Sequence, residues 1–300
     1  MSATLLQIIQ AAMGEMGLSS PTLVVGSSDQ QVTNMLALAN ACGEELCREY
    51  PWQALNKPYI FTVQYSTITG STTLGSTTLT TASTSGIDTT YQISGPGINQ
   101  ATFVDAVPSG TTLTLSQIAT STQTSQSYTL CKVKYAMPSD YDRQIDRTHW
   151  DKSKHWEMLG PETPQQWEWL ISGYISTGPR VRYRIVGGYF QIWPMLNTSE
   201  VLGFEYVSNA WAASSSGTAQ TSFAADTDTC IFPKRLMVAK LKLKFFELKG
   251  FDTNDFYGDY NRELNIAKAN DGGSPDLSMA PRASRILIGW EQIPDSGYGS

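Results

Sequence analysis

Residues 180–207 read RVRYRIVGGYFQIWPMLNTSEVLGFEYV, and this stretch decides the expected fold. Apolar and polar side chains alternate on both sides of its Gly-Gly pair, which is typical of a β hairpin with a two-residue turn. The last seven residues alternate again, and every second side chain among them is large and apolar. Three or four antiparallel strands hold together in water when one face is apolar. The stretch therefore predicts an antiparallel sheet at the centre of the chain.

The hairpin lies within residues 135–211, which contain six of the eight tryptophans of the chain. Large aromatic side chains dominate both protein cores and interfaces. The same stretch holds carboxylates at Asp140 and Asp142, with His149 and His155 nearby, and such groups can perform acid–base chemistry. However, several Lys and Arg residues lie beside them, which favours an ion-paired or solvated face. We therefore expect a scaffold without catalytic residues, and the protein is not expected to be an enzyme.

Three arginines occupy one face of the first hairpin strand, because side chains alternate along a strand. They are Arg180, Arg182 and Arg184. A row of this kind could hold a phosphate group or an acidic partner. It could equally face water, and the residues alone leave these alternatives open.

Both ends of the chain show the helical spacing of apolar residues. A capping box formed by Ser28 and Gln31 is expected to begin the second helix. The predicted helices cover residues 4–16, 28–50, 233–249 and 253–270.

The helix predicted at residues 233–249 has two apolar faces when it is drawn at 100° per residue. A helix of this kind must be covered on two sides. Other helices of the chain can cover one side, so we expect a neighbouring subunit to cover the other. The residues assigned to this subunit interface are Val238, Leu241, Phe245 and Leu248.

Residues 66–129 form a Ser/Thr-rich tract in which short apolar runs alternate with glycine-containing turns. Asp88 and Asp105 are its only charged residues. Recurring Thr, Val, Ile and Tyr favour a folded all-β module, whereas low-complexity Ser/Thr tracts can also be disordered stalks. Residues 59–65 and 128–135, on either side, both have strand-like patterns. If these two flanks pair, the module is the tip of a long hairpin, where an insertion is well tolerated.

The overall composition argues against several classes of protein. The net charge of −6 disfavours binding to duplex DNA, which requires a basic surface. Only 16% of the residues are charged, against about 25% in typical globular proteins, so partners are expected to cover much of the surface. Four cysteines without a C-x-x-C pair, together with only two histidines, predict free thiols and neither a metal site nor a cofactor site. No apolar run is long enough to span a membrane, and the N-terminus lacks the basic region of a signal peptide.

Beyond residue 273 the helical pattern ends. Residues 281–300 contain one apolar run followed by a tryptophan, and such side chains are unfavourable in water. We expect this segment to be a tail that docks onto a partner, for example by adding a strand. The docking residues are expected to be Arg285, Ile286, Leu287, Ile288 and Trp290.

Five short motifs occur in a fixed order, with helices before the first and after the last. They are PWQAL at 51–55, MPSDY at 137–141, YFQIWP at 189–194, LGFEY at 202–206 and DTD at 226–228. In this order they resemble the head-to-tail adaptor, or tail tubular, proteins of short-tailed bacteriophages. The resemblance covers residues 1–65 and 130–280. The segment between them is instead similar to a β unit inserted in many phage virion and surface proteins.

The resemblance implies a structural virion protein that forms a homo-oligomer, a dodecameric ring at the head–tail junction assembled in the host cytoplasm. The ring would bind the portal protein on one side and a tail nozzle or hub protein on the other. DNA would pass through its lumen during ejection without sequence-specific binding, and no membrane would be involved. The C-terminal tail would reach into the portal.

The expected fold class is α+β. We expect an α-helical bundle of the N-terminal and C-terminal helices with a central antiparallel β sheet. These form an adaptor core at 1–65 and 130–280, with an inserted all-β domain at 66–129 and a docking tail at 281–300. A second function stays open on the residues alone, namely a receptor- or glycan-binding virion protein that acts through the inserted module. Glycan binding by the isolated module, without ring formation by the whole chain, would favour that alternative.

Overall fold

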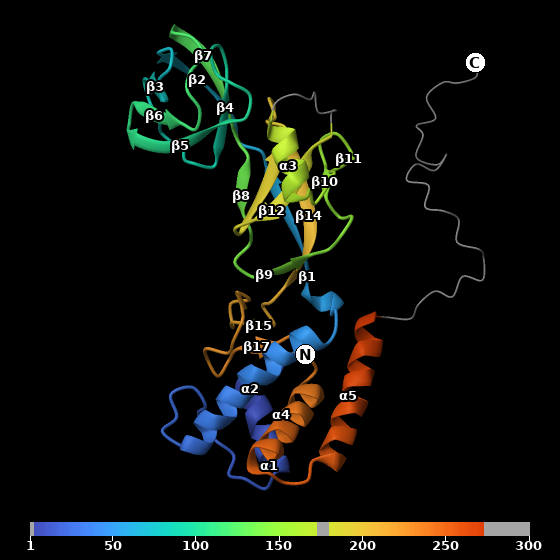
Figure 1. The fold of residues 1–300 in the computed structure, drawn as a ribbon. Coiled ribbons are helices and arrows are strands. Elements are labelled where there is room, and N and C mark those ends of the chain that lie inside the picture. Colours follow the sequence, from blue (N-terminus) through green and yellow to red (C-terminus); the bar gives the residue numbers. More distant parts are fainter. Residues whose placement is uncertain (1–2, 173–179, 273–300) are drawn as a thin grey trace, which may run out of the picture.

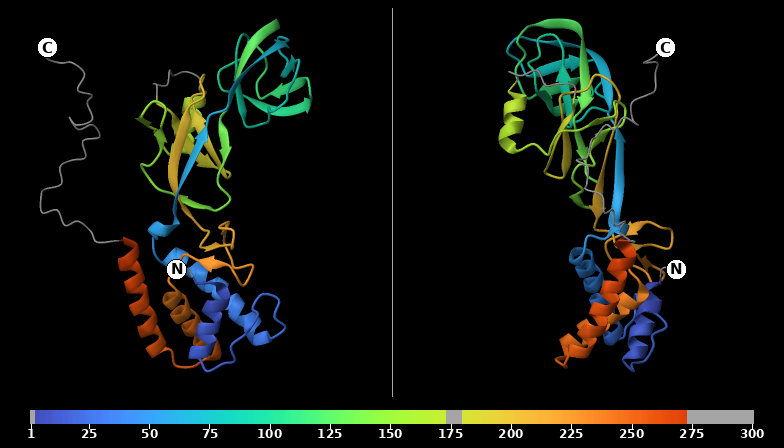
Figure 2. Two further views of the ribbon diagram at one scale, coloured as in Figure 1. Left: turned by 180° about the vertical axis from the view of Figure 1, so that it is seen from behind. Right: turned by 90° about the vertical axis from the view of Figure 1, so that its right-hand side faces the viewer.

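The computed structural model describes residues 3–172 and 180–272 and shows an α+β protein. Four of the five described α-helices gather at one end of the molecule, sheets form its middle with the remaining helix beside them, and a closed β barrel stands at the opposite end (Figure 1). Figure 2 shows the same order from two further sides. The chain runs out to the barrel and returns, so its first and last described helices lie together.

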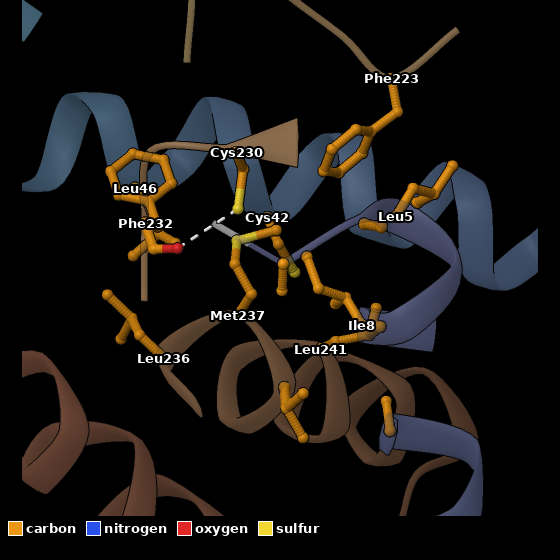
Figure 3. Close-up of a cluster of buried hydrophobic side chains, with 14 of the residues drawn as sticks. Leu5, Ile8, Cys42, Leu46, Phe223, Cys230, Phe232, Leu236, Met237 and Leu241 are labelled. Carbon is orange, nitrogen blue, oxygen red and sulfur yellow. Dashed lines mark hydrogen bonds between the residues drawn. The ribbon is translucent and has the colours of Figure 1, made fainter. Parts of the chain in front are cut away.

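Four helices share one hydrophobic core at the helical end. They are α1 (Leu5–Glu15), α2 (Gln30–Glu49), α4 (Lys234–Lys249) and α5 (Asn254–Gly272). Figure 3 shows side chains of α1, α2 and α4 meeting in this core. The fully buried members include Leu5, Ile8, Met35, Leu46, Leu236 and Met237. The apolar spacing in the sequence predicted all four helices, with ends within two residues of those observed.

The helix starts follow local capping rules. Thr4 caps α1 with a capping box: its hydroxyl accepts from the N–H of Gln7 at 3.3 Å, and the Gln7 side chain accepts in return at 3.2 Å. The capping box expected at Ser28 is wrong. Asp29 caps α2 instead, because its carboxylate reaches the N–H of Gln31 at 2.8 Å.

A short 3-10 turn, η1 (Gln53–Leu55), joins the helical end to the sheets. The indole N–H of Trp52 donates to the carbonyl of Leu46 at 2.6 Å, and its ring is buried. Asp271, near the end of α5, accepts from the backbone N–H groups of Gln53 and Ala54 at 2.6 and 3.2 Å. The beginning of the β part is therefore held by both α2 and α5.

Two antiparallel sheets face each other in the middle of the molecule, where the sequence predicted a single sheet. One contains β1 (Asn56–Thr62), β14 (Val201–Ser208), β10 (Trp150–Asp151), β11 (Trp156–Glu157) and β9 (Tyr141–Gln144). The other contains β12 (Arg182–Val186), β13 (Tyr189–Trp193) and β8 (Lys134–Ala136).

Residues 59–65 and 128–135 pair only at one end, where Tyr65 lies opposite Cys131, because the residues before it pair elsewhere. β1 pairs with β14, and Tyr59 lies opposite Phe204. Both sheets carry aromatic side chains on their inner faces, and Phe190 of β13 packs 4.9 Å from Phe204. These side chains become buried only when two sheets face each other, which explains why one sheet is not formed. The β12–β13 hairpin itself is as predicted, with its turn at Gly187 and Gly188.

Six strands between Tyr65 and Lys132 close into a barrel with its own core. They are β2 (Tyr65–Thr72), β3 (Thr78–Thr81), β4 (Tyr91–Ser94), β5 (Thr102–Ser109), β6 (Thr112–Leu115) and β7 (Gln123–Lys132), in the order β2-β3-β6-β5-β4-β7. β2 and β7 pair directly, with Tyr65 opposite Cys131. The two connections between the barrel and the rest of the chain therefore lie side by side.

A small helix, α3 (Pro164–Ile171), joins the barrel to the central sheets. Trp167 and Leu170 of α3 form a buried cluster with Trp193, at the end of β13, and with Ala101 of the barrel. Phe103 of β5 packs against the same cluster. The barrel is therefore packed against the sheets by apolar contacts in addition to its two chain connections.

The loop expected at residues 212–229 contains a third small sheet. Its strands are β15 (Ala212–Ala213), β16 (Ala219–Gln220) and β17 (Thr229–Cys230). Asp226 accepts from the N–H groups of Val24 and Val25 at 3.0 and 2.7 Å, and thereby holds the loop that follows α1. Strands of two residues carry too short an alternation to be recognised in a sequence.

Candidate interaction surfaces

Asp140, the first of the two carboxylates considered for catalysis, is a structural joint. It accepts hydrogen bonds from Lys57, Tyr206 and Ser208 at 2.7, 2.8 and 2.7 Å. Burial raises the pKa of this carboxyl, but the three hydrogen bonds outweigh burial and lower the pKa to about 2. Asp142 is exposed and pairs with an adjacent arginine at 3.2 Å. Asp140 therefore ties β1 to β14 as a fixed negative charge.

His149 is a core residue. Its ring stacks on Tyr183 and Phe204, with centroids 4.1 and 4.9 Å away, and its Nδ1 lies 3.0 Å from the Tyr183 hydroxyl. Burial lowers the pKa of His149 to about 4, so its imidazole is neutral at pH 7. His155 is exposed at the surface.

Two of the three arginines in the predicted row are used inside the chain. Arg182 pairs with Glu162 at 2.5 Å, and the Arg184 guanidinium lies 4.6 Å from the ring centre of Trp167. Arg180 is exposed. The row therefore helps to hold α3 and the loop before it against β12.

Three of the four residues predicted for a subunit interface lie in the chain's own core. Val238, Leu241 and Phe245 are 1%, 0% and 9% exposed, whereas Leu248 is 64% exposed. α1, α2 and α5 all pack against α4 and together cover both of its apolar faces. The expectation that a neighbouring subunit must cover the second face is therefore wrong for these three residues, because the chain supplies enough helices of its own.

Leu248 belongs to an exposed apolar patch at the turn between α4 and α5. We use the name α4–α5 patch for three exposed residues near this turn, Leu248, Phe251 and Tyr257, of which the last two are 62% and 57% exposed. An open groove of about 330 Å³ is lined by Leu248 and by Asp29 and Gln31 at the start of α2. Single exposed apolar residues are common, and three near one turn make this end of the molecule a candidate contact surface. The sequence pattern identified Leu248 only, because Phe251 lies in the turn and Tyr257 lies outside the apolar stripe of α5.

A second open groove lies on the outer face of the sheet formed by β1, β14 and β10. We call it the outer-sheet groove; its volume is about 630 Å³, and Ile60, Trp150, Lys152, His155 and Gly203 line it. A β-carbon added at Gly203 would stand 2.9 Å from Cε of Lys152 and 3.3 Å from Cγ1 of Ile60. The glycine therefore keeps this part of the sheet surface hollow. In the sequence it is visible only as one small residue within an alternating strand.

Two residues of the outer-sheet groove have backbone conformations that L-residues rarely adopt. Arg147 and His155 have φ values of +62° and +57°. A side chain in this region raises the energy of the backbone, and such residues concentrate at functional sites. Both lie in loops next to β10, so the loop conformations that present these two side chains are maintained at a cost.

A pair of buried carboxyl groups lies at one side of this groove. Asp151 and Glu200 are each 2% exposed. Asp151 accepts from the N–H groups of Ser153 and Lys154 at 2.9 and 3.0 Å, and Glu200 lies 2.5 Å from the ammonium of Lys154. Burial, together with the hydrogen bond and charge of Glu200, raises the pKa of Asp151. Oδ2 of Asp151 and Oε2 of Glu200 are buried and have no hydrogen-bond partner among the described residues.

The predicted docking tail lies outside the described residues. It includes Arg285, Ile286, Leu287, Ile288 and Trp290. Within residues 3–172 and 180–272, no group of three His, Cys, Asp or Glu side chains is placed to hold a metal ion. In the same part of the chain, no helix has the length and apolar character needed to cross a membrane.

Comparison of the sequence with protein-family models and with curated proteins finds no match. The function must therefore be inferred from the residues themselves and from their arrangement. The resemblance to phage adaptor proteins stays a prediction.

Proposed function

We propose that the chain is a structural virion protein that forms a ring between the portal vertex and the tail of a short-tailed bacteriophage. Twelve copies surround a channel, with the portal protein on one side and a tail nozzle or hub protein on the other. The helices form a bundle around the channel, and the β part faces outward or towards the tail. DNA passes through without sequence-specific contacts, and the protein performs no chemical step.

The motifs that carry the resemblance act as structural joints, which supports this proposal. Trp52 closes the end of α2, Asp140 binds both β1 and β14, and Asp226 holds the loop after α1. Each of these side chains positions backbone elements. That is the role expected of residues in a scaffold rather than in a catalytic centre.

The α4–α5 patch is the observation that carries the proposal. A closed ring requires that one surface of each subunit meets a different surface of the next. The patch offers an apolar surface at the helical end, and the groove between Leu248 and the start of α2 lies beside it. Contacts at this end place the helices nearest to the neighbouring subunits, as the proposed ring requires.

The direct test is negative-stain electron microscopy of the purified chain, alone and mixed with a portal ring. We expect rings, or chains bound around the portal. The double variant Leu248→Glu/Phe251→Glu should remain monomeric, because carboxylates would have to be buried at the contact. The control Ile118→Glu changes a residue in the barrel that is 56% exposed and should assemble normally. An unmodified chain that stays monomeric and never joins a portal would contradict the proposal.

The alternative function, glycan or receptor binding by the barrel, has less support. Residues 66–129 contain three aromatic residues, which are the side chains that sugars stack on. Tyr91 and Tyr128 are buried in the barrel core, and Phe103 is partly buried against the α3 cluster. Exposed apolar side chains of the barrel are the aliphatic Leu74 and Ile118. The barrel therefore offers no aromatic platform for a sugar ring.

A further inference from the structure

β1 is an edge strand whose free side is available for pairing. Among the described strands, β14 is its only partner. The N–H of Val63 donates to the carbonyl of Glu200 at 2.8 Å. In an antiparallel pair every second residue is hydrogen-bonded to the neighbouring strand, so this bond identifies which residues of β1 bind β14. Lys57, Tyr59 and Phe61 therefore point their backbone groups at β14. The backbone groups of Asn56, Ile60 and Thr62 point away from the sheet, and Pro58 between them has no N–H.

Both faces of this open edge are apolar. Ile60 is 53% exposed on the face of the outer-sheet groove, and Pro58 also lines that groove. On the opposite face, Tyr59 and Phe61 are partly buried against the core between the two sheets. A strand that is added to β1 would therefore meet apolar surface on both faces of the sheet, and would need apolar side chains on both of its own faces. A continuous apolar run suits such a position better than an alternating one.

The rim of the groove is positively charged although the chain as a whole is acidic. Arg147 and Lys152 line the groove, and within the described residues neither forms an ion pair. Glu205 is the exposed acidic side chain of the same groove. The net charge of the whole chain is −6, so the charge at this rim is opposite in sign to that of the chain. A carboxylate on the added strand would be favoured near it.

The chain's own C-terminal segment has the required chemistry and leaves the described structure beside β1. Asp271, one residue before the end of α5, bonds the N–H of Gln53 at 2.6 Å, and β1 begins at Asn56. The 13 residues from 273 to 285 can span up to about 45 Å, which exceeds the roughly 15 Å from the start of β1 to Ile60. Residues 286–291 then read ILIGWE, a continuous apolar run followed by a carboxylate.

We propose that residues 286–291 add to the open edge of β1 of the same chain as an extra strand. Leu287 and Glu291 then lie on the face of the outer-sheet groove, beside Ile60 and the positive rim, and Ile286 and Ile288 lie on the other face, beside Tyr59 and Phe61. The inference goes beyond the proposed ring. It assigns the segment a binding site on its own subunit, from which a partner such as the portal would have to displace it.

The test measures backbone amide exchange at single residues in the full-length chain. Strand addition protects the amides of Ile60 and Thr62, which point away from β14. In the full-length variant Ile286→Asp/Ile288→Asp, exchange at these two amides should accelerate about ten-fold or more. Exchange at Tyr59 and Phe61 should stay unchanged, because β14 already binds these amides. Equal exchange at Ile60 and Thr62 in both proteins would overturn the proposal.

Two further measurements separate this proposal from its competitors. Ile60→Asp should release the segment and abolish the protection of Thr62, whereas the control Val186→Asp, at a strand residue 46% exposed outside the groove, should not. Protection that increases with protein concentration would show that a second copy supplies the segment, and would overturn the same-chain assignment. Ring formation is scored separately by microscopy, so failure of this proposal is distinguishable from failure of the ring.

Discussion

Trp211 lies so close to Gly43 that no side chain fits between them. A β-carbon added at residue 43 would stand 2.3 Å from Cζ2 of the indole. Gly43 lies within α2, and Trp211 immediately precedes β15 and packs at 4.7 Å against Phe223. The contact therefore joins α2 to the small sheet through bare helix backbone.

Gly43→Ala should destabilise the protein. Helix propensity alone would favour alanine by about 1 kcal/mol. Overpacking a buried site costs about 1–3 kcal/mol, and here the neighbour is a rigid ring that is itself fully buried. We expect a net decrease in the free energy of unfolding of up to about 2 kcal/mol, measured by urea denaturation. The control Gly14→Ala, where an added β-carbon meets nothing within 4 Å, should stabilise by about 0.5–1 kcal/mol. Stabilisation by both substitutions would show that Trp211 moves aside freely.

Glu49→Gln should cost more stability than Glu45→Gln. Lys240 is 5% exposed and lies 2.9 Å from Glu49 and 3.3 Å from Glu45. Glu49 also accepts from the Tyr260 hydroxyl of α5, and hydrogen bonds from Tyr260 and Lys240 outweigh the effect of burial and lower its pKa. We expect a loss of about 1.5–3 kcal/mol for Glu49→Gln. Glu45→Gln, at a more exposed residue, should lower the free energy of unfolding by less than about 1 kcal/mol. Chemical denaturation checks the order, and a larger loss for Glu45→Gln would contradict it.

Stability should change with pH in opposite directions at Asp151 and Asp140. The pKa of Asp151 is raised in the folded chain. Its contribution to the free energy of unfolding is therefore complete below about pH 4 and is lost as the pH rises through the pKa of the folded chain. Asp151→Asn removes a carboxyl group whose burial disfavours its charged form, and should raise the free energy of unfolding at pH 7 by about 1 kcal/mol. The pKa of Asp140 is lowered, so its contribution is present above about pH 4 and is lost as pH falls towards 2.

The measurement for these pH effects is urea denaturation between pH 3 and pH 8. The control is Asp142→Asn, a substitution at an exposed residue, which should change the free energy of unfolding by less than about 0.5 kcal/mol. A loss of stability at pH 7 in Asp151→Asn would show that the ionised carboxylate is required there.

Removal of the barrel should leave the rest of the protein folded. Tyr65 and Cys131 are paired across β2 and β7, so their Cα atoms are about 4.5–5.5 Å apart and a short Gly-Ser linker can replace residues 66–130. The deletion uncovers Trp167 and its cluster, so we expect a loss of about 1–3 kcal/mol. Helicity by circular dichroism and ring formation by microscopy should persist. An unfolded product would show that the core depends on the barrel.

Deletion of residues 281–300 should weaken binding to a portal ring without changing helicity. The described helices all end before this segment. Binding is measured by co-sedimentation with portal rings, and circular dichroism reports helicity. Unaltered portal binding would remove the docking role of the tail.

Local patterns were sufficient to predict the elements whose signal lies within one segment. The helices, the β12–β13 hairpin and the strand at Val201–Ser208 each carry their own periodicity or turn. Partners distant in sequence were not predictable in this way. Tyr59 has the same strand pattern whether it pairs with β7 or with β14, and only the aromatic residues of the facing sheet decide between them.

The surfaces were the least predictable feature, because burial depends on what the rest of the chain covers. Val238 and Leu241 are apolar on a two-faced helix, and nothing within that helix shows that α1, α2 and α5 together enclose it. The outer-sheet groove depends on the absence of a side chain at Gly203 and on two loops in unusual conformations. A single sequence contains no periodic signal for either.

The path from η1 through β1 into β2 has a mechanical consequence. Only Val63 and Gln64 separate the two strands, so one extended backbone runs from the helical end to the barrel. A force applied to the barrel would therefore be transmitted along this backbone, and along the β1–β14 pairing, to the helical end. The junction would therefore carry tension between the barrel and the helical end through the chain itself, without separating the packed helices.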